Sequence, residues 1–424
     1  MATRRILVIT YPFPPMPSVG GNRWLAMTKY LRRRGHRVDI LTTSAFGALP
    51  TDAENRVHRS GDLDSAPWLR KLLRRPPLPE PGSNAAIDKP PQAYVTGILV
   101  PDHYVATWVP YAIATARRLI ADNGYDVMIT TSAYESTHLV GLGLGRRRRP
   151  AWIADFRDGW TFHPWRPPFP TELQRRLDVA LERAVVRGAQ RTIVVERPVG
   201  DDFRRRLGVD AGYVANGWDP DLATDAGGAE LPPLERRGLT LVHTGKLSGE
   251  WGRHPGSLFE ALRRICAEDP EAPGRLQLVL AGRLNHEEQR LIEQAGLQQI
   301  VRHVGMLTRP QSLALQRSAD VLVLLTSPTL VWELPGKVFE YFGARRPILA
   351  LAQGNETARL IEETGTGWTV PAGDVDAIVA RLKDLLERGP RLEFDDARLA
   401  PYVYPAPVEA LEHEVERAIA LRPA

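Results

Sequence analysis

Short apolar segments alternate with helical patterns along nearly the whole chain, and this alternation restricts the fold more than any other feature of the sequence. Many of these segments have the length and the apolar content of buried strands. They are residues 4–10, 36–43, 127–131, 152–156, 191–195, 239–243, 276–281, 301–304, 321–325, 348–352 and 368–370. Strands that are separated by helices pair in parallel sheets with helices on both faces. The sequence therefore predicts an α/β protein with doubly wound sheets.

The chain is long enough for two domains. Its 424 residues exceed what one hydrophobic core usually serves. A stretch rich in Gly, Asp and Pro interrupts the alternation at residues 216–233, as is typical of a linker. We expect an N-terminal Rossmann-like domain over residues 1–215, a C-terminal Rossmann-like domain over 216–400, and a helix in 401–424 that packs back toward the N-terminal domain. Ligands of such sheets bind beyond the carboxyl ends of the strands, so two facing domains would share a central cleft.

Composition excludes several other classes of protein. Hydrophobic residues make up 43% of the chain and charged residues 25%, as in ordinary globular proteins. The single cysteine, Cys266, excludes an internal disulfide and lies in an amphipathic pattern that favours core packing. The apolar run at residues 6–9 is too short for a signal peptide, and no run approaches the ~20 residues of a membrane span, so we expect a cytoplasmic protein. The net charge of +5 comes without any nucleic-acid-binding motif.

One helix start has the residues of an anion site. Pro335 suits the first turn of a helix that follows the apolar segment 321–325, and Gly336 lets a ligand approach the backbone. The free N–H groups and partial positive charge of such a helix start bind a diphosphate, and Lys337 adds a full charge. Glu340 would accept both hydroxyls of a ribose. Spacing alone leaves an alternative open, a capped amphipathic helix with an ordinary pair of Lys337 and Glu340.

The segment 335–348 resembles the donor-binding signature of glycosyltransferase family 4, whose members are retaining enzymes of the GT-B fold. Within that family it is most similar to the bacterial branch that builds polysaccharides and glycosylates lipid-linked or small-molecule acceptors. Four other places match, and together they extend over nearly the whole chain. They are the loop with Pro14, Pro15, Gly20, Gly21, Asn22 and Arg23, the segment 154–160, the segment 216–219 and the segment 243–246.

The resemblance implies a hexosyl transfer from a nucleotide diphosphate sugar, with UDP as the first candidate nucleotide and dTDP or GDP as alternatives. It implies that Glu340 holds the ribose and that Lys246 and Arg253 grip the diphosphate. Those two cations and the helix at Pro335 would then stabilise the departing diphosphate, which itself takes the acceptor proton. On this account no protein nucleophile and no metal is required, and no cluster of Cys and His suggests zinc.

The same resemblance gives roles to residues elsewhere in the chain. Gly20 and Gly21 would let the first loop touch the pyrophosphate without a side-chain clash. Arg23 would stack or pair there, with a surface role as the alternative. Arg283 is a candidate for the edge of the nucleotide, with a solvated arginine as the alternative.

One position departs from the family pattern. The family usually has two glutamates eight positions apart, and the first binds hydroxyls of the donor sugar. Trp332 occupies that place here, and the acid is Glu333. A one-residue bulge would restore the sugar contact of Glu333, or the donor is a deoxysugar that needs no such partner.

The acceptor side is expected in the N-terminal domain. Asp155, Arg157 and Asp158 follow the strand at 152–156, where a carboxylate would orient or deprotonate the acceptor hydroxyl and Arg157 would hold Asp155 or a phosphate. The alternative is a buried Asp–Arg pair that fixes the loop. His103 and His138 are further acceptor-side candidates, with structural histidines as the alternative.

Basic and apolar residues segregate at helical spacing in the segment 67–75, a pattern typical of interfacial helices. This segment predicts a peripheral membrane contact and fits a polyprenyl phosphate acceptor, whereas a lid helix over the cleft explains the pattern equally well. Two other functions remain open besides sugar transfer. One is a nucleotide-sugar epimerase or hydrolase of the same fold, and the other is an inactive scaffold that binds nucleotide sugars.

Overall fold

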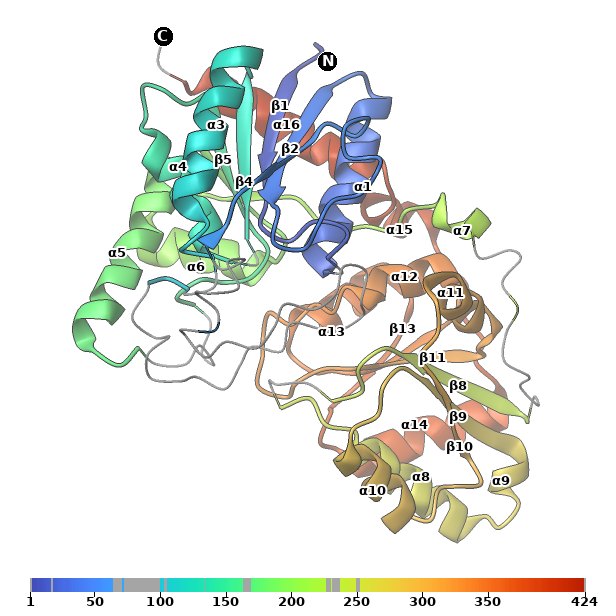
Figure 1. Cartoon of the computed structure of the whole chain (residues 1–424). Coiled ribbons are helices and arrows are strands. Elements are labelled where there is room, and N and C mark those ends of the chain that lie inside the picture. Colours follow the sequence, from blue (N-terminus) through green and yellow to red (C-terminus); the bar gives the residue numbers. More distant parts are fainter. Residues whose placement is uncertain are drawn as a thin grey trace. The chain divides into compact units, whose positions relative to one another are not determined.

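The computed structural model of the chain describes residues 2–16, 18–63, 71, 100–102, 105–132, 134–162, 169–225, 230, 237–248 and 252–422. These residues form two compact units (Figure 1). Unit 1 contains Met1–Asn216 and Pro405–Ala424, and unit 2 contains Gly217–Tyr404. Of the positions singled out in the sequence, His103 and the segment 67–75, apart from Lys71, lie outside the described residues.

Unit 1 is built on a parallel sheet of seven strands in the order β3-β2-β1-β4-β5-β6-β7. The strands are β1 (Arg5–Ile9), β2 (Arg37–Thr43), β3 (Val57–Ser60), β4 (Val127–Thr131), β5 (Ala151–Phe156), β6 (Arg191–Val194) and β7 (Gly212–Tyr213). The apolar pattern predicts all of them except β3 and β7. Those two are short strands at the edges of the sheet, where only one neighbour is available and few apolar residues are needed.

Helices cover both faces of the unit 1 sheet, with α3 and α4 in front of it and α16 behind it in Figure 1. The helices are α1 (Val19–Arg33), α3 (Val109–Asn123), α4 (Ser136–Leu144), α5 (Glu172–Gly188), α6 (Arg197–Leu207) and α16 (Ala406–Ala420). Four tryptophans, Trp24, Trp108, Trp152 and Trp160, are fully buried between these layers. Gly141 on α4 allows a close approach of that helix to the sheet, because a Cβ atom there would lie 2.3 Å from the indole of Trp152.

Unit 2 is built on a parallel sheet of six strands in the order β10-β9-β8-β11-β12-β13. The strands are β8 (Leu239–Thr244), β9 (Leu276–Ala281), β10 (Val301–Gly305), β11 (Val321–Leu325), β12 (Ile348–Leu351) and β13 (Gly367–Val370). Each lies where the apolar pattern predicts it. The two sheets confirm the predicted α/β class with doubly wound, Rossmann-like units.

The helices of unit 2 are α7 (Leu222–Asp225), α8 (Gly256–Glu268), α9 (Ala272–Arg275), α10 (His286–Gln294), α11 (Arg309–Ser318), α12 (Lys337–Ala344), α13 (Glu356–Thr364), α14 (Val375–Arg388) and α15 (Asp396–Leu399). Cys266 lies on α8 and packs against the unit 2 core, and burial raises the pKa of its thiol. The core-packing role predicted for this residue is therefore confirmed.

Helix α16 belongs to unit 1 although it follows unit 2 in the chain, and it packs beside α1 and across β4, β5 and β6. Ion pairs hold it there. Glu412 Oε1 accepts hydrogen bonds from Arg34 Nε and His36 Nε2, both at 2.8 Å. Arg191 Nε lies 2.6 Å from Glu414 Oε2. Burial raises the pKa of Glu412, but the hydrogen bonds from Arg34 and His36 outweigh it and hold that pKa below its ordinary value.

We expect Glu412→Ala to lower the free energy of unfolding by about 2–4 kcal/mol, because the substitution leaves buried His36 and half-buried Arg34 without their shared carboxylate. Glu409 provides the matched control. Its carboxylate also pairs with Arg34 but is 48% exposed, so Glu409→Ala should cost less than about 1 kcal/mol. Urea unfolding followed by circular dichroism measures both. An equal decrease in the free energy of unfolding in both variants would contradict the view that the buried carboxylate of Glu412 holds α16.

Candidate functional site

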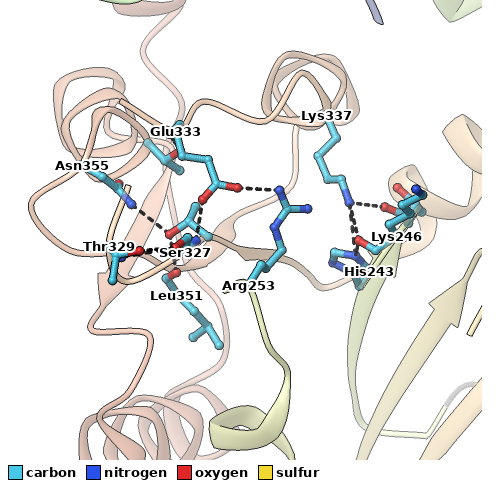
Figure 2. Close-up of polar contacts among 12 residues, drawn as sticks. His243, Lys246, Arg253, Ser327, Thr329, Glu333, Lys337, Leu351 and Asn355 are labelled. Atoms are coloured by element: carbon cyan, nitrogen blue, oxygen red, sulfur yellow. Dashed lines mark hydrogen bonds and ion pairs between the residues drawn. The ribbon is translucent and has the colours of Figure 1, made fainter. Parts of the chain in front are cut away.

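Three cationic side chains come together at the carboxyl edge of the unit 2 sheet. Lys246 and Arg253 follow β8, and Lys337 is the first residue of α12, which follows β11. Neighbouring parallel strands end at the same edge, so the loops that follow them meet there. Figure 2 shows the amine of Lys337 directed at the loop of His243 and Lys246, and the guanidinium of Arg253 directed at Glu333.

The amine of Lys337 is held by the end of β8. Its Nζ donates to Thr244 O at 2.7 Å and lies 3.2 Å from His243 Nε2 and 3.4 Å from Lys246 O. Burial, together with the positive charge of Arg253, lowers the pKa of Lys337 to about 7. Because this pKa lies near neutral pH, an anion bound nearby would increase the fraction of Lys337 that carries a charge.

His243 is neutral in this arrangement. Burial and the nearby charge of Lys337 lower its pKa to about 3. Its Nδ1 lies 2.9 Å from Val323 O, and its Nε2 lies 3.1 Å from Lys246 O and 3.2 Å from Lys337 Nζ. The histidine thus ties α12 to both β8 and β11.

Glu333, for which the sequence left a contact with the donor sugar open, pairs with Arg253. Its Oε1 accepts from Arg253 Nη2 at 2.5 Å, and its Oε2 accepts from the backbone N–H of Ser327 at 2.5 Å. Thr357 Oγ1 donates to the backbone carbonyl of Glu333 at 2.5 Å and fixes the loop. Both carboxylate oxygens therefore have partners inside unit 2, and the glutamate orients the arginine.

Arg253 retains an unused donor. Its side chain is 15% exposed, and its Nε is buried without a hydrogen-bond partner among the described residues. Leaving a buried donor unpaired is costly, so such a group at the edge of a sheet is suited to a ligand oxygen. Glu333 pairs directly with Arg253, and the negative charges of Glu333 and Glu340 both act on Lys337.

Glu340, in the first turn of α12, is held from two sides. Arg309 Nη2 donates to its Oε1 and Gln316 Nε2 to its Oε2, both at 3.3 Å. Gln316 is fully buried and also donates to Thr244 Oγ1 at 3.0 Å. The carboxylate itself remains 30% exposed and able to accept further hydrogen bonds. No motif marks Arg309 or Gln316 in the sequence, because both reach Glu340 from α11.

The start of α12 differs slightly from the prediction. Gly336 is the N-cap residue and Lys337 the first helical residue, so Pro335 precedes the helix instead of occupying its first turn. No side chain caps this helix start. The N-cap glycine offers no side-chain acceptor to the first N–H groups, and Val338 N donates to Pro335 O at 3.0 Å.

Lys246 and Arg283 are the exposed cations of this edge. Lys246 follows β8 and Arg283 follows β9. Neither side chain has a hydrogen-bond or ion-pair partner within the described part of the chain. Both side chains are therefore free to move toward a ligand.

In unit 1, Gly20 and Gly21 lie in the first turn of α1 and make close contacts within the protein. A Cβ atom on Gly20 would lie 2.3 Å from Arg157 Nη1, and one on Gly21 would lie 2.8 Å from the Oγ of Ser18, the N-cap of α1. The guanidinium of Arg157 thus covers the start of α1. Its Nε is buried without a hydrogen-bond partner among the described residues.

Arg23 is a buried structural residue, 5% exposed, which differs from both roles considered in the sequence. Its guanidinium donates to Ala215 O at 2.8 Å and Val214 O at 3.0 Å. It also lies 3.7 Å from Asp155 Oδ1. Asp155 is fully buried, and its Oδ2 accepts from Trp24 Nε1 at 3.1 Å. The structure therefore favours the alternative of a buried Asp–Arg pair, with Arg23 in place of Arg157.

The two remaining acceptor-side candidates, Asp158 and His138, differ in how exposed their side chains are. Asp158 is half-buried. His138 is fully buried, stacks on Phe156 with ring centroids 4.5 Å apart and lies 2.8 Å from Thr130 Oγ1. Burial lowers the pKa of His138 to about 3, so its ring is neutral. His138 is thus a packing residue of unit 1, and Asp158 is the more accessible carboxylate of the loop.

Two further searches covered the described residues only. Among them, no group of three or more His, Cys, Asp or Glu side chains is arranged to hold a metal ion. None of the described helices is both long enough and apolar enough to cross a membrane.

Models of glycosyltransferase domains match both units. The model described as "Glycosyl transferase 4-like domain" matches residues 20–215, and the one described as "Glycosyl transferases group 1" matches residues 238–388. A comparison of the sequence with curated proteins found no match.

Several solved structures share the fold over nearly their whole length. Sucrose-phosphate synthase from Thermosynechococcus elongatus is similar with a TM-score of 0.68 and 17% identity, covering 98% of this chain and 99% of that one. The lipopolysaccharide outer core galactosyltransferase WaaB gives 0.62 and 13%, covering 97% and 99%. The UDP-GlcNAc 2-epimerase from Neisseria meningitidis, bound to UDP-GlcNAc, gives 0.51 and 11%, covering 97% and 100%.

Arg23→Ala is expected to lower the free energy of unfolding by about 2–4 kcal/mol, because it leaves Asp155 buried without its cation and two backbone carbonyls without a donor. Arg157→Ala, at the same edge of the sheet, should change it by less than about 1 kcal/mol. Urea denaturation compares the two variants. A stable Arg23→Ala protein would show that the pair is dispensable and reopen a ligand role for Arg23.

Proposed function

We propose that this chain, a glycosyltransferase of the GT-B fold, transfers a hexosyl group with retention of configuration from a nucleotide diphosphate sugar to a hydroxyl of a lipid-linked saccharide or small-molecule acceptor. One observation carries the proposal. The uncapped start of α12 and the cations Lys246, Arg253 and Lys337 meet at one edge of the unit 2 sheet, beside the half-exposed carboxylate of Glu340.

The donor is assigned to unit 2. The diphosphate takes the unpaired Nε–H of Arg253, the exposed ammonium of Lys246 and the N–H groups at Gly336 and Lys337. Glu340 accepts the ribose hydroxyls, and Arg283 lies toward the edge of the base. UDP is the first nucleotide to test, with dTDP and GDP as alternatives.

The same cations explain the chemistry. Cleavage of the bond between sugar and phosphate leaves negative charge on the diphosphate, and positive groups that are already in place stabilise it without reorganisation. Arg253 is the best placed of them, because Glu333 fixes its guanidinium. The leaving phosphate then takes the proton of the acceptor hydroxyl on the face from which it departs. In this scheme no protein nucleophile and no metal ion is required.

The acceptor is assigned to unit 1. Asp158 is the carboxylate that best fits contact with the acceptor, since Asp155 is fully buried. Arg157, which lies over the start of α1 at Gly20, supplies a cation for a phosphate group. We place the enzyme in the cytoplasm, in peripheral contact with the inner face of the cell membrane, where lipid-linked acceptors are available.

Glu340→Ala and Lys246→Ala should each weaken nucleotide binding by about tenfold to a hundredfold, because each removes a charged partner of the ligand. Calorimetry and thermal-shift measurements with UDP, dTDP, GDP and ADP test this. Glu293→Ala, an exposed carboxylate on α10, is the control and should bind as the wild type does. Unchanged affinity in both site variants would remove the donor-site assignment.

Affinity for a UDP-sugar should fall as the pH rises above about 7. A bound diphosphate favours the charged form of Lys337 and raises its pKa above the value of about 7 in the free protein. Affinity is thus full below pH 7 and decreases by up to about tenfold per pH unit between the free and bound values. A UDP-sugar is used because its phosphates carry no group that titrates near neutrality.

Calorimetry across this pH range measures the effect, and Lys337→Met should abolish the dependence. A wild-type affinity that is flat with pH would exclude Lys337 from the site. Conversion of the UDP-sugar without any acceptor would instead favour an epimerase or hydrolase.

A further inference from the structure

Helix α5 in unit 1 has an unusual distribution of polarity. Its acids Asp178 and Glu182 are buried, whereas Leu173 is 76% exposed and Leu177 is 48% exposed. Surface helices normally place leucines toward the core and acids toward solvent. The packing of the described part of unit 1 therefore does not account for the exposed leucines of α5.

The buried acids of α5 have hydrogen-bond and ion-pair partners within unit 1. Trp160 Nε1 donates to Asp178 Oδ1 at 2.8 Å. Thr161 Oγ1 donates to Glu182 Oε2 at 2.5 Å, and Arg206 Nη1 lies 2.9 Å from the same oxygen. These contacts fix which side of the helix faces the protein. A rotation that buried the leucines would break all of them.

The outer face carries an apolar stripe with a basic border. Leu173, Leu177, Ala180 and Ala184 follow one another at helical spacing, and all four are exposed. We define the α5 outer face as this stripe together with the exposed arginines that run along one side of it. The arginines are Arg176, Arg183 and Arg187, and Arg187 also donates to Leu207 O at 3.1 Å.

The surroundings add further positive charge. Arg175 on α5 is exposed, and Glu172 is the acid that pairs with both Arg175 and Arg176. Arg149 Nη2 donates to Gly188 O at 2.6 Å, which holds the turn with the exposed residues 146–148, all arginine, beside the last turn of α5. The helix and its neighbouring turn are thus strongly cationic.

We propose that the α5 outer face docks on the surface of an anionic lipid bilayer. Leucines that enter the boundary of the acyl chains remove their apolar surface from water, and arginines beside them contact lipid phosphates. Charge complementarity selects this occupant. A protein partner would have to be apolar and acidic along the same line, whereas every anionic bilayer offers both features over its whole surface.

The exposed leucines of α5 lie at the same edge of the unit 1 sheet as the proposed acceptor site. Helix α5 follows β5, so its first turns, with Leu173 and Leu177, lie at the carboxyl edge of the sheet, where Asp158 lies. Trp160 and Thr161 fasten that loop to α5. Docking would hold the proposed acceptor edge at the bilayer. This last step rests on the proposed transfer to a lipid-linked acceptor, whereas the docking itself does not.

Sedimentation of the full chain with vesicles tests the docking. We expect binding to vesicles of phosphatidylcholine with phosphatidylglycerol, weak binding to phosphatidylcholine alone, and loss of binding at high salt. The double variant Leu173→Ser with Leu177→Ser should bind at least about tenfold more weakly. Arg176→Gln with Arg183→Gln should lose about fivefold per arginine.

Leu25→Ser is the matched control, because Leu25 is 50% exposed on α1 in the same unit. It should bind vesicles as the wild type does, and all variants should keep the wild-type melting temperature and affinity for UDP. Wild-type affinity for vesicles in the leucine double variant would overturn the proposal. A wild-type dimer that this variant converts to a monomer would also overturn it, because the face would then join two copies of the chain.

The outcomes separate the docking from the proposed function. A protein that binds UDP but no anionic vesicles rejects the docking and the proposed peripheral membrane contact, and leaves the donor site intact. A protein that binds vesicles but no nucleotide rejects the donor site and leaves the docking intact.

Discussion

The contact between Lys337 and the end of β8 is the interaction on which the rest of the unit 2 site depends. Lys337 Nζ binds Thr244 O at 2.7 Å, so the first residue of α12 is fastened to a strand almost a hundred residues earlier in the chain. Tyr341, one turn further along α12, donates to Val323 O at 3.3 Å. These contacts bring the start of α12 to the carboxyl edge shared by β8 and β11. Without them, Glu340 would not face that edge.

The arrangement concentrates positive charge and compensates only part of it. Glu333 accepts from one donor of Arg253, whose Nε has no hydrogen-bond partner among the described residues. Burial and the charge of Arg253 lower the pKa of Lys337. In the proposed function, a bound diphosphate adds negative charge beside these cations. Electrostatic preorganisation of this kind suits a reaction in which a diphosphate departs.

Unit 1 is stabilised by charge pairs that the fold buries. Asp155 is joined to Arg23, and Glu412 of α16 is joined to Arg34 and His36. The exposed charges of α5 are instead nearly all cationic. Buried pairs thus fix the positions of α1, β5 and α16, while the outer surface keeps arginines and leucines available for a partner. Burial explains the difference between the paired charges inside unit 1 and the exposed arginines of α5. A buried carboxylate without a partner destabilises the fold, whereas an exposed arginine remains solvated by water.

The sequence by itself determined the α/β class, the strands that carry most of both sheets, and a helix that starts close to Lys337 and Glu340. Those conclusions depend on periodicity and on residues that are close together in the chain. The tertiary structure alone decided that Glu333 pairs with Arg253, that Gln316 supports Glu340, and that Arg23 is buried. Each of these depends on side chains that come from distant segments, and which partner a charge finds is set by packing and not by local pattern. The exposed leucines of α5 belong to the same group, because a helical stripe in a sequence does not say which face the core will take.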